Sequence, residues 1–106
     1  MIVSTESTAL KSQCDIAGVW KHSEKEAWLN VDLEKGVIIV KSHASNPSAE
    51  GLTVIKSLAY TGQANWNGKM YDARSKNFVP VKISEGNCKE LVVVMDVSGV
   101  LRLLRE

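Results

Sequence analysis

The sequence predicts an all-β protein: a small antiparallel up-and-down barrel of about eight strands with a short N-terminal helix. Short β-branched and apolar runs recur about every ten residues, and a turn signal follows each of them. No repeat, low-complexity tract or linker interrupts the 106 residues, a length that fits one domain. We place the barrel at 16–106, after an N-terminal segment at 1–15. Eight antiparallel strands close readily and remove exposed edges. An open, strongly curved sheet capped by the helix is the alternative.

The N-terminal half supplies the helix and three strands. The expected helix covers one or two turns around 5–13, where Ser and Thr can cap its start. A short strand at 19–22 comes next, and 27–33 alternates in polarity, which places every second residue on one face. That face consists of Ala27, Leu29, Val31 and Leu33. The residues 34–36 predict a tight turn into a strand at 37–41, because glycine adopts positive φ without steric cost.

The C-terminal half supplies the other five strands. After a loop at 45–48, a β-branched run at 52–60 ends at Thr61-Gly62-Gln63, and a further strand covers 66–72. The strand at 78–83 contains Pro80. Because proline has no backbone N–H, we expect this strand at a sheet edge or with a bulge. The last two strands are expected at 91–97 and 100–105, after turns at 85–87 and 98–99.

Charge and hydropathy argue against two classes of partner. The net charge is +1, so no broad field favours nucleic acid or an anionic membrane, and we expect no nucleic-acid partner. The best basic cluster, Lys69, Tyr71, Arg74 and Lys76, is diluted by Asp72. The longest apolar run has only five residues, Leu91-Val92-Val93-Val94-Met95, and is too short to span a bilayer.

The N-terminus and the cysteines bear on the compartment. The first residues lack a basic start and an apolar stretch, so they do not predict a secretory signal. We therefore expect a cytoplasmic protein, or a periplasmic one if a signal peptide has been removed. Cys14 and Cys88 could approach each other in a closed barrel, whose first and last strands are neighbours, so an internal bridge is one alternative. A reducing cytosol nevertheless favours two free thiols, which we expect here.

No pattern in the sequence predicts catalysis. A nucleophile motif, a phosphate-binding loop and paired carboxylates are all missing, so we expect a non-enzyme without a cofactor. His22 and His43 have no zinc-site spacing, so we expect no metal and place both at strand ends on the surface. Asp32, Asp72 and Asp96 fall near strand ends, where we expect them to serve turns.

A small apolar or amphipathic ligand is the function that the aromatic residues favour. Trp66, Gly68 and Met70 share one face of a strand, and Gly68 leaves space between two large side chains. Trp20 and Tyr71 add aromatic surface. The candidate ligand-binding residues are therefore Trp20, Trp66, Met70 and Tyr71. An eight-stranded barrel is just wide enough for side chains or one small ligand, so a filled interior is the alternative.

Several motifs resemble those of a known family. The chain has an Asn-Pro loop at 46–47, a Gly-Leu strand start at 51–52, and a Trp-x-Gly-x-Met-Tyr-Asp strand at 66–72. With Gly18-Val19-Trp20 near the start and Arg105 in the last strand, these motifs resemble the bacterial family catalogued as domain of unknown function 2147. The resemblance extends from about residue 16 to the C-terminus. Three departures from the family pattern are Ala73 in place of proline, Leu103 or Leu104 in place of tryptophan, and the missing signal peptide.

The resemblance implies a lipocalin-like barrel and carries no established activity. In such barrels the early tryptophan closes one end, and an arginine of the last strand packs across it. The barrel-closing residues it implies are Gly18, Trp20, Arg102 and Arg105. We therefore expect a non-catalytic bacterial barrel that binds a small apolar or amphipathic ligand. The alternative is a protein-interaction or homodimerising β module that uses the edge at 78–83.

Overall fold

Strands make up most of the described chain. The structure, a computed structural model, describes residues 14–95 and 100–106, so the helix expected at 5–13 lies outside the described residues. One short 3₁₀ helix, η2 (Pro47–Ala49), follows the third strand. The strands are β1 (Gly18–His22), β2 (Ala27–Asp32), β3 (Val37–His43), β4 (Thr53–Gly62), β5 (Asn65–Asp72), β6 (Asn77–Gly86), β7 (Glu90–Val94) and β8 (Val100–Arg105). Within the described part, no helix is long and apolar enough to cross a membrane.

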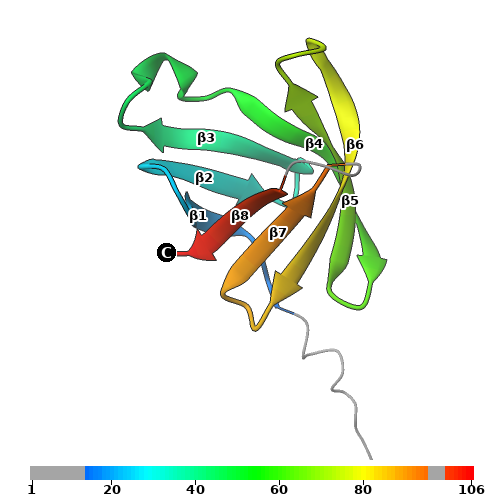
Figure 1. Ribbon diagram of the computed structural model, residues 1–106. Helices are drawn as coiled ribbons and strands as arrows, with labels where there is room; N and C mark the ends of the chain where they lie inside the picture. The colour runs from blue at the N-terminus through cyan, green and yellow to red at the C-terminus, as the bar shows by residue number, and fades with distance from the viewer. Residues whose placement is uncertain (1–13, 96–99) are drawn as a thin grey trace, which may run out of the picture.

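The eight strands form a closed antiparallel barrel (Figure 1). Each strand pairs with the next along the chain, and β8 pairs with β1, where Trp20 lies opposite Arg105. This confirms the expected all-β antiparallel barrel and shows that the open-sheet alternative is wrong. The β1–β8 pairing satisfies backbone groups that two edge strands would otherwise expose.

Several strand ends differ from the expectation: β3 reaches His43, β6 continues through Glu85 and Gly86, where a turn was expected, and β7 ends at Val94. β2 ends at Asp32, and Leu33 lies in the following turn with 40% of its surface exposed, so its expected place on the inward face is wrong. β4 continues through Thr61 and Gly62, which were expected to break it. It continues because Gly62 pairs with Asn65 and closes a two-residue turn. Pairing across a hairpin therefore extended the strand beyond its β-branched part.

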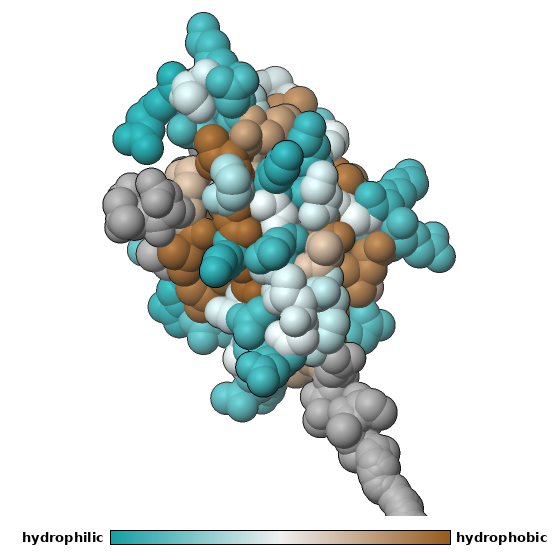
Figure 2. Space-filling view, turned by 90° about the vertical axis from the view of Figure 1, so that its right-hand side faces the viewer, coloured by the Kyte–Doolittle hydropathy of each residue, from teal (hydrophilic) through white to brown (hydrophobic). Residues whose placement is uncertain are grey.

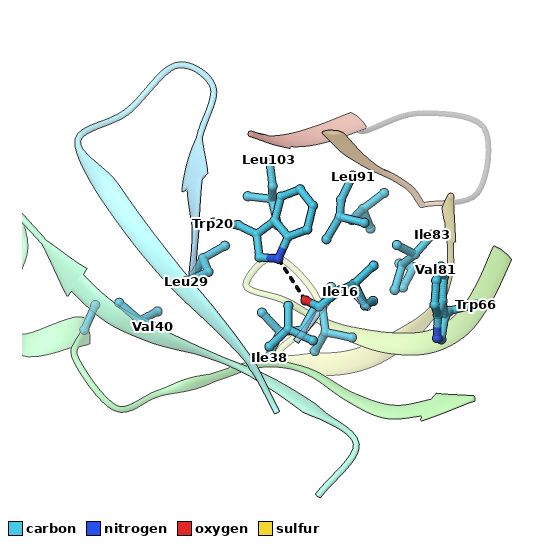
Figure 3. Close-up of a cluster of buried hydrophobic side chains, with 14 residues drawn as sticks. Ile16, Trp20, Leu29, Ile38, Val40, Trp66, Val81, Ile83, Leu91 and Leu103 are labelled. Carbon is cyan, nitrogen blue, oxygen red and sulfur yellow. Dashed lines mark hydrogen bonds between the residues drawn. The ribbon is translucent and has the colours of Figure 1, made fainter. Parts of the chain in front are cut away.

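The core lies inside the barrel and is built from alternate residues of every strand (Figure 3). The larger side chains with under 2% exposure include Trp20, Ile16, Ile38, Ile55, Ile83, Leu91 and Leu103. No polar or charged residue is buried among the described residues. An apolar interior of this kind stabilises the barrel by the hydrophobic effect, at about 25 cal/mol per Å² of buried apolar surface.

Pro80 marks the place where the barrel wall changes. β6 pairs with β5 along its whole length, and Pro80 lies opposite Lys69 there. Pairing with β7 begins only at Lys82, which lies opposite Val94. The first half of β6, 77–81, therefore extends past the end of β7. The prediction of an edge strand is wrong for β6 as a whole, because β6 pairs with both β5 and β7. It is correct at Pro80, which lies before the pairing with β7 begins.

A disulfide joins Cys14 to Cys88, with a Cα–Cα distance of 5.4 Å. It connects the segment before β1 to the turn between β6 and β7. The expectation of two free thiols is therefore wrong. Ile16, two residues after Cys14, is fully buried in the core, so this segment lies against the barrel end and brings the two cysteines within bridging distance.

Candidate ligand-binding site

The tryptophan of the early Gly-x-Trp motif is completely buried. The indole N–H of Trp20 donates a hydrogen bond to the carbonyl oxygen of Ile16 at 2.9 Å (Figure 3). The guanidinium carbon of Arg105 lies 4.7 Å from the centre of the indole ring, and its Nη2 donates to the carbonyl of Ala17 at 3.4 Å. Gly18 has a φ of +113°, a conformation that favours glycine. These contacts make Trp20 part of the packed core.

Arg102, the other arginine proposed for barrel closing, does not contact Trp20 in this way. It lies three residues before Arg105, so alternation along β8 turns it to the outer face. There its guanidinium forms an ion pair with the carboxylate of Glu90. The sequence motif did not decide which arginine packs on Trp20, because that depends on which residue of β8 lies opposite Trp20.

The other three proposed ligand-binding residues lie on two faces of one strand. Trp66 is 8% exposed and packs 4.9 Å from the ring of Tyr60. Met70 shares its face, is partly buried and packs against the core. Tyr71 faces outward, is 44% exposed and contacts Phe78 edge-on at 5.6 Å. The four candidates, Trp20 included, are therefore not brought together around one opening.

The space beside Gly68 is occupied. A Cβ atom at this position would lie 3.0 Å from Cγ2 of Ile55 and 3.4 Å from Cδ2 of Leu58. Both side chains come from β4, which carries an irregular register between Lys56 and Ala59. Gly68 therefore allows close packing of β4 on β5, and Ile55 and Leu58 fill the space on the side where a Cβ would lie.

An open hollow of about 790 Å³ lies in the barrel wall, where β7 ends and β6 continues. Figure 2 shows the molecule from the side of β5 and β6, with apolar side chains in brown beside charged ones in teal. Both outward and inward positions of the strands line the hollow, because no strand among the described residues pairs with that edge of β6 there. The lining consists of Ser57, Asn67, Gly68, Lys69, Asp72, Arg74, Val79, Pro80, Val81, Lys82, Val94 and Met95.

The acidic group of the hollow is engaged by its own turn. Asp72 Oδ1 accepts a hydrogen bond from the N–H of Arg74 at 3.1 Å, and Oδ2 accepts one from the Ser75 hydroxyl at 3.2 Å. The guanidinium of Arg74 lies 3.7 Å from the same carboxylate. Asp72 therefore serves a turn, as expected, and so does Asp32, which accepts from the N–H of Lys35 at 3.1 Å. Asp96 lies outside the described residues.

The two histidines end strands and are partly buried. The N–H of Glu24 donates to Nδ1 of His22 at 3.0 Å. Burial lowers the pKa of His22, and the nearby charge of Lys25 lowers it further. Among residues 14–95 and 100–106, no group of three or more His, Cys, Asp and Glu side chains could hold a metal ion.

A second, smaller hollow of about 420 Å³ lies on the outer face, lined by Val19, Trp28, Lys41, Ser42 and Glu106. Its indole N–H, from Trp28, already donates to the Glu106 carboxylate, and the Lys21 ammonium lies 5.7 Å from the ring. The aromatic group is thus engaged by neighbours, so the hollow at the end of β7 is the better candidate for a ligand.

Comparison of the chain with family models, curated proteins and solved structures finds no match. The function must therefore be inferred from the hollow itself. Sequence reasoning missed most of its lining, above all Val79, Lys82, Val94 and Met95. Pro80 was a usable signal, because a proline within a strand marks a place where one side of that strand is unpaired.

Proposed function

We propose that this chain is a non-catalytic, lipocalin-like bacterial barrel that binds a small apolar or amphipathic molecule. The observation that carries the proposal is the hollow at the end of β7. Its volume of about 790 Å³ falls within the range of small-molecule sites, roughly 300–1,000 Å³. Valine, proline and methionine side chains supply most of its apolar lining, and a few charged groups lie among them.

Binding rather than catalysis is supported by the state of the polar groups. The carboxylate in the lining, Asp72, accepts hydrogen bonds from its own turn and lies beside Arg74. A general base needs a carboxylate positioned to take a proton from a substrate, and Asp72 is held instead by the turn. The hollow therefore offers apolar surface and positive charge to a ligand, with no activated nucleophile.

Two features support the family resemblance and the compartment as parts of this proposal. The packing of Arg105 on Trp20 is the arrangement that a resemblance to the domain of unknown function 2147 family implies for a lipocalin-like barrel. The bridge between Cys14 and Cys88 favours an oxidising compartment, because cytosolic reductants keep thiols reduced. We therefore place the protein in the periplasm rather than the cytoplasm.

An interaction or homodimerising module is the second candidate. The observation that favours it is the edge of β6 at 77–81, which no strand among the described residues pairs with on the β7 side. An added strand would extend the sheet there. Pro80 has no N–H to donate to such a strand, and Lys76 and Lys82 flank it. Proline and lysine are the residues that protect sheet edges from pairing. A small molecule therefore suits this edge better than a strand.

Nuclear magnetic resonance titration with decanol tests the proposed function on the intact, oxidised chain. We expect amide shift changes at Val79, Val81 and Lys82 and at Val94 and Met95, because these residues line the hollow. Val94→Trp should fill the hollow and weaken binding, whereas the matched change Val19→Trp, on the outer face of β1, should not. Shift changes confined to other parts of the barrel, or none at all, would contradict the proposal.

A further inference from the structure

Two lysines face each other directly across β4 and β5. Lys56 and Lys69 are register partners, and both are exposed on the outer face. Like charges directly opposite each other destabilise a sheet. Lys82 belongs to the same region: it lies on the outer face of β6, two residues after Pro80, which is the partner of Lys69. Three adjacent strands therefore each contribute one ammonium group, an arrangement that costs stability.

These charges are not neutralised by acids within the described residues. The ion pairs there join Lys21 to Glu26, Arg74 to Asp72, and Arg102 to Glu90, and none involves the three lysines. Lys56 instead lies 4.3 Å from the centre of the Phe78 ring. Lys69 and Lys82 both line the hollow. Since the whole chain has a net charge of only +1, the positive charge is a local property of this site.

We propose that the ligand of this hollow is an anionic amphiphile, whose head group is bound by Lys69 and Lys82. The inference rests on the proposed function and adds the charge of the ligand. Both ammonium groups donate charge-assisted hydrogen bonds to a carboxylate, sulfate or phosphate head. The tail packs on the apolar part of the lining, which includes Val79, Val94 and Met95. The bound anion then offsets the repulsion between the ammonium groups of Lys69 and Lys82.

A polyanion such as single-stranded nucleic acid is the competing ligand for a basic face. It would need exposed aromatic rings on which bases stack. The rings of Tyr71 and Phe78, on the neighbouring part of β5 and β6, contact each other edge-on, and the ammonium group of Lys56 lies over Phe78. The lysines that line the hollow lie instead beside aliphatic side chains, which suit an acyl or alkyl tail.

Calorimetric titration with three ligands of equal tail length tests the charge preference: decyl sulfate, decanol and decylammonium, each below its micelle concentration. We expect decyl sulfate to bind about tenfold more tightly than decanol, and decylammonium more weakly than both. Lys69→Gln with Lys82→Gln should reduce the affinity for decyl sulfate to that for decanol. Lys41→Gln, on an exposed lysine of β3, is the matched control and should leave all three affinities unchanged.

The outcomes separate this inference from the proposed function. Equal affinities for the three ligands would overturn the anion preference and leave the binding of an amphiphile intact. Binding of none of them would overturn the proposed function and the inference with it. Tight binding of a thymidine oligonucleotide that depends on Lys69 and Lys82, with no binding of decyl sulfate, would show a polyanion surface instead. Circular dichroism of the same samples establishes that each variant keeps the β-barrel.

Discussion

At the scale of single residues, Trp20 connects three parts of the chain. Its ring fills the barrel interior, its N–H bonds to Ile16 before β1, and Arg105 of β8 covers its face. A cation over an indole contributes about 0.5–2 kcal/mol. The two other tryptophans have less central positions: Trp66 packs on Tyr60, and Trp28 is partly exposed on the outer face. Because Trp20 and Trp28 differ in burial, the effects of replacing each of them on stability can be compared directly.

Trp20→Ala should destabilise the protein far more than Trp28→Ala. Removing a buried tryptophan costs about 3–5 kcal/mol, while a domain of this size has only about 5–15 kcal/mol of stability. Trp28 is partly exposed, so Trp28→Ala removes fewer contacts with the protein, and these include surface groups such as Lys21. Urea denaturation of the oxidised protein measures both changes. Equal and small shifts of the midpoint would contradict the central role of Trp20.

His22 should make stability depend on pH. Its pKa is lowered in the folded protein, chiefly by burial, from an ordinary value of 6.5. As the pH falls below 6.5, His22 takes up a proton in the unfolded chain before it does so in the folded protein. The free energy of unfolding therefore decreases from there until the pH passes the lower pKa of the folded protein. Protonation also removes the Nδ1 acceptor that binds the N–H of Glu24. His22 thus favours the folded state at neutral pH.

Urea midpoints at about pH 7.5 and about pH 5 test this pH dependence, since an ordinary histidine titrates between them. We expect a lower midpoint at the acid pH, and a smaller difference in His22→Gln. A difference that is unchanged in His22→Gln would exclude this histidine as its source.

At the scale of elements, the β4–β5 hairpin contains a strained turn. Gly62 pairs with Asn65, which leaves Gln63 and Ala64 as a two-residue loop. Both have positive φ, +55° and +63°, as a type I′ turn requires. Glycine and asparagine adopt this conformation readily, whereas glutamine and alanine do not. The side chain of Asn65 compensates in part, because its Nδ2 donates to the carbonyl of Gln63 at 2.9 Å.

Ala64→Gly should therefore stabilise the protein, by up to about 1 kcal/mol, because glycine removes the steric cost of the left-handed conformation. The matched control is Ala59→Gly in the middle of β4, where the same change should destabilise by about 0.5–1 kcal/mol. Thermal denaturation followed by circular dichroism measures both. A lower melting temperature for Ala64→Gly would show that this turn is not strained.

At the scale of the whole molecule, two long-range connections hold the barrel together. β8 closes on β1, and the disulfide joins the segment before β1 to the β6–β7 turn across 74 positions of sequence. Cys88 lies in a turn where it and Asn87 both have positive φ. The bridge therefore restrains both the β6–β7 turn and the segment before β1. Its contribution to the stability of the protein can be measured.

Cys14→Ser with Cys88→Ser should lower the free energy of unfolding by about 2–5 kcal/mol, since the bridge limits the freedom of the unfolded chain. Urea denaturation of the double variant and of the oxidised protein provides the comparison. A thiol titration of the denatured protein, purified without reductant, should find no thiol from these two residues. Two titratable thiols per chain would show that the bridge does not form.

The sequence by itself determined the class of structure and the position of nearly every strand. Alternation in 27–32 and 66–72, together with glycine and polar turns, was sufficient, because burial on one face of a strand leaves a period of two. It also predicted that Trp20 is buried, and that the strand of Pro80 is unpaired on one side near the proline. These are local signals, each carried by a residue and its immediate neighbours.

Only the tertiary structure decided which residues meet across the barrel. Register selected Arg105 over Arg102 as the partner of Trp20. The space expected at Gly68 was filled by β4, a strand that the pattern around Gly68 does not describe. The hollow and the disulfide depend on where β7 stops and where the chain enters the barrel. Such pairings join distant positions, and local periodicity does not record them.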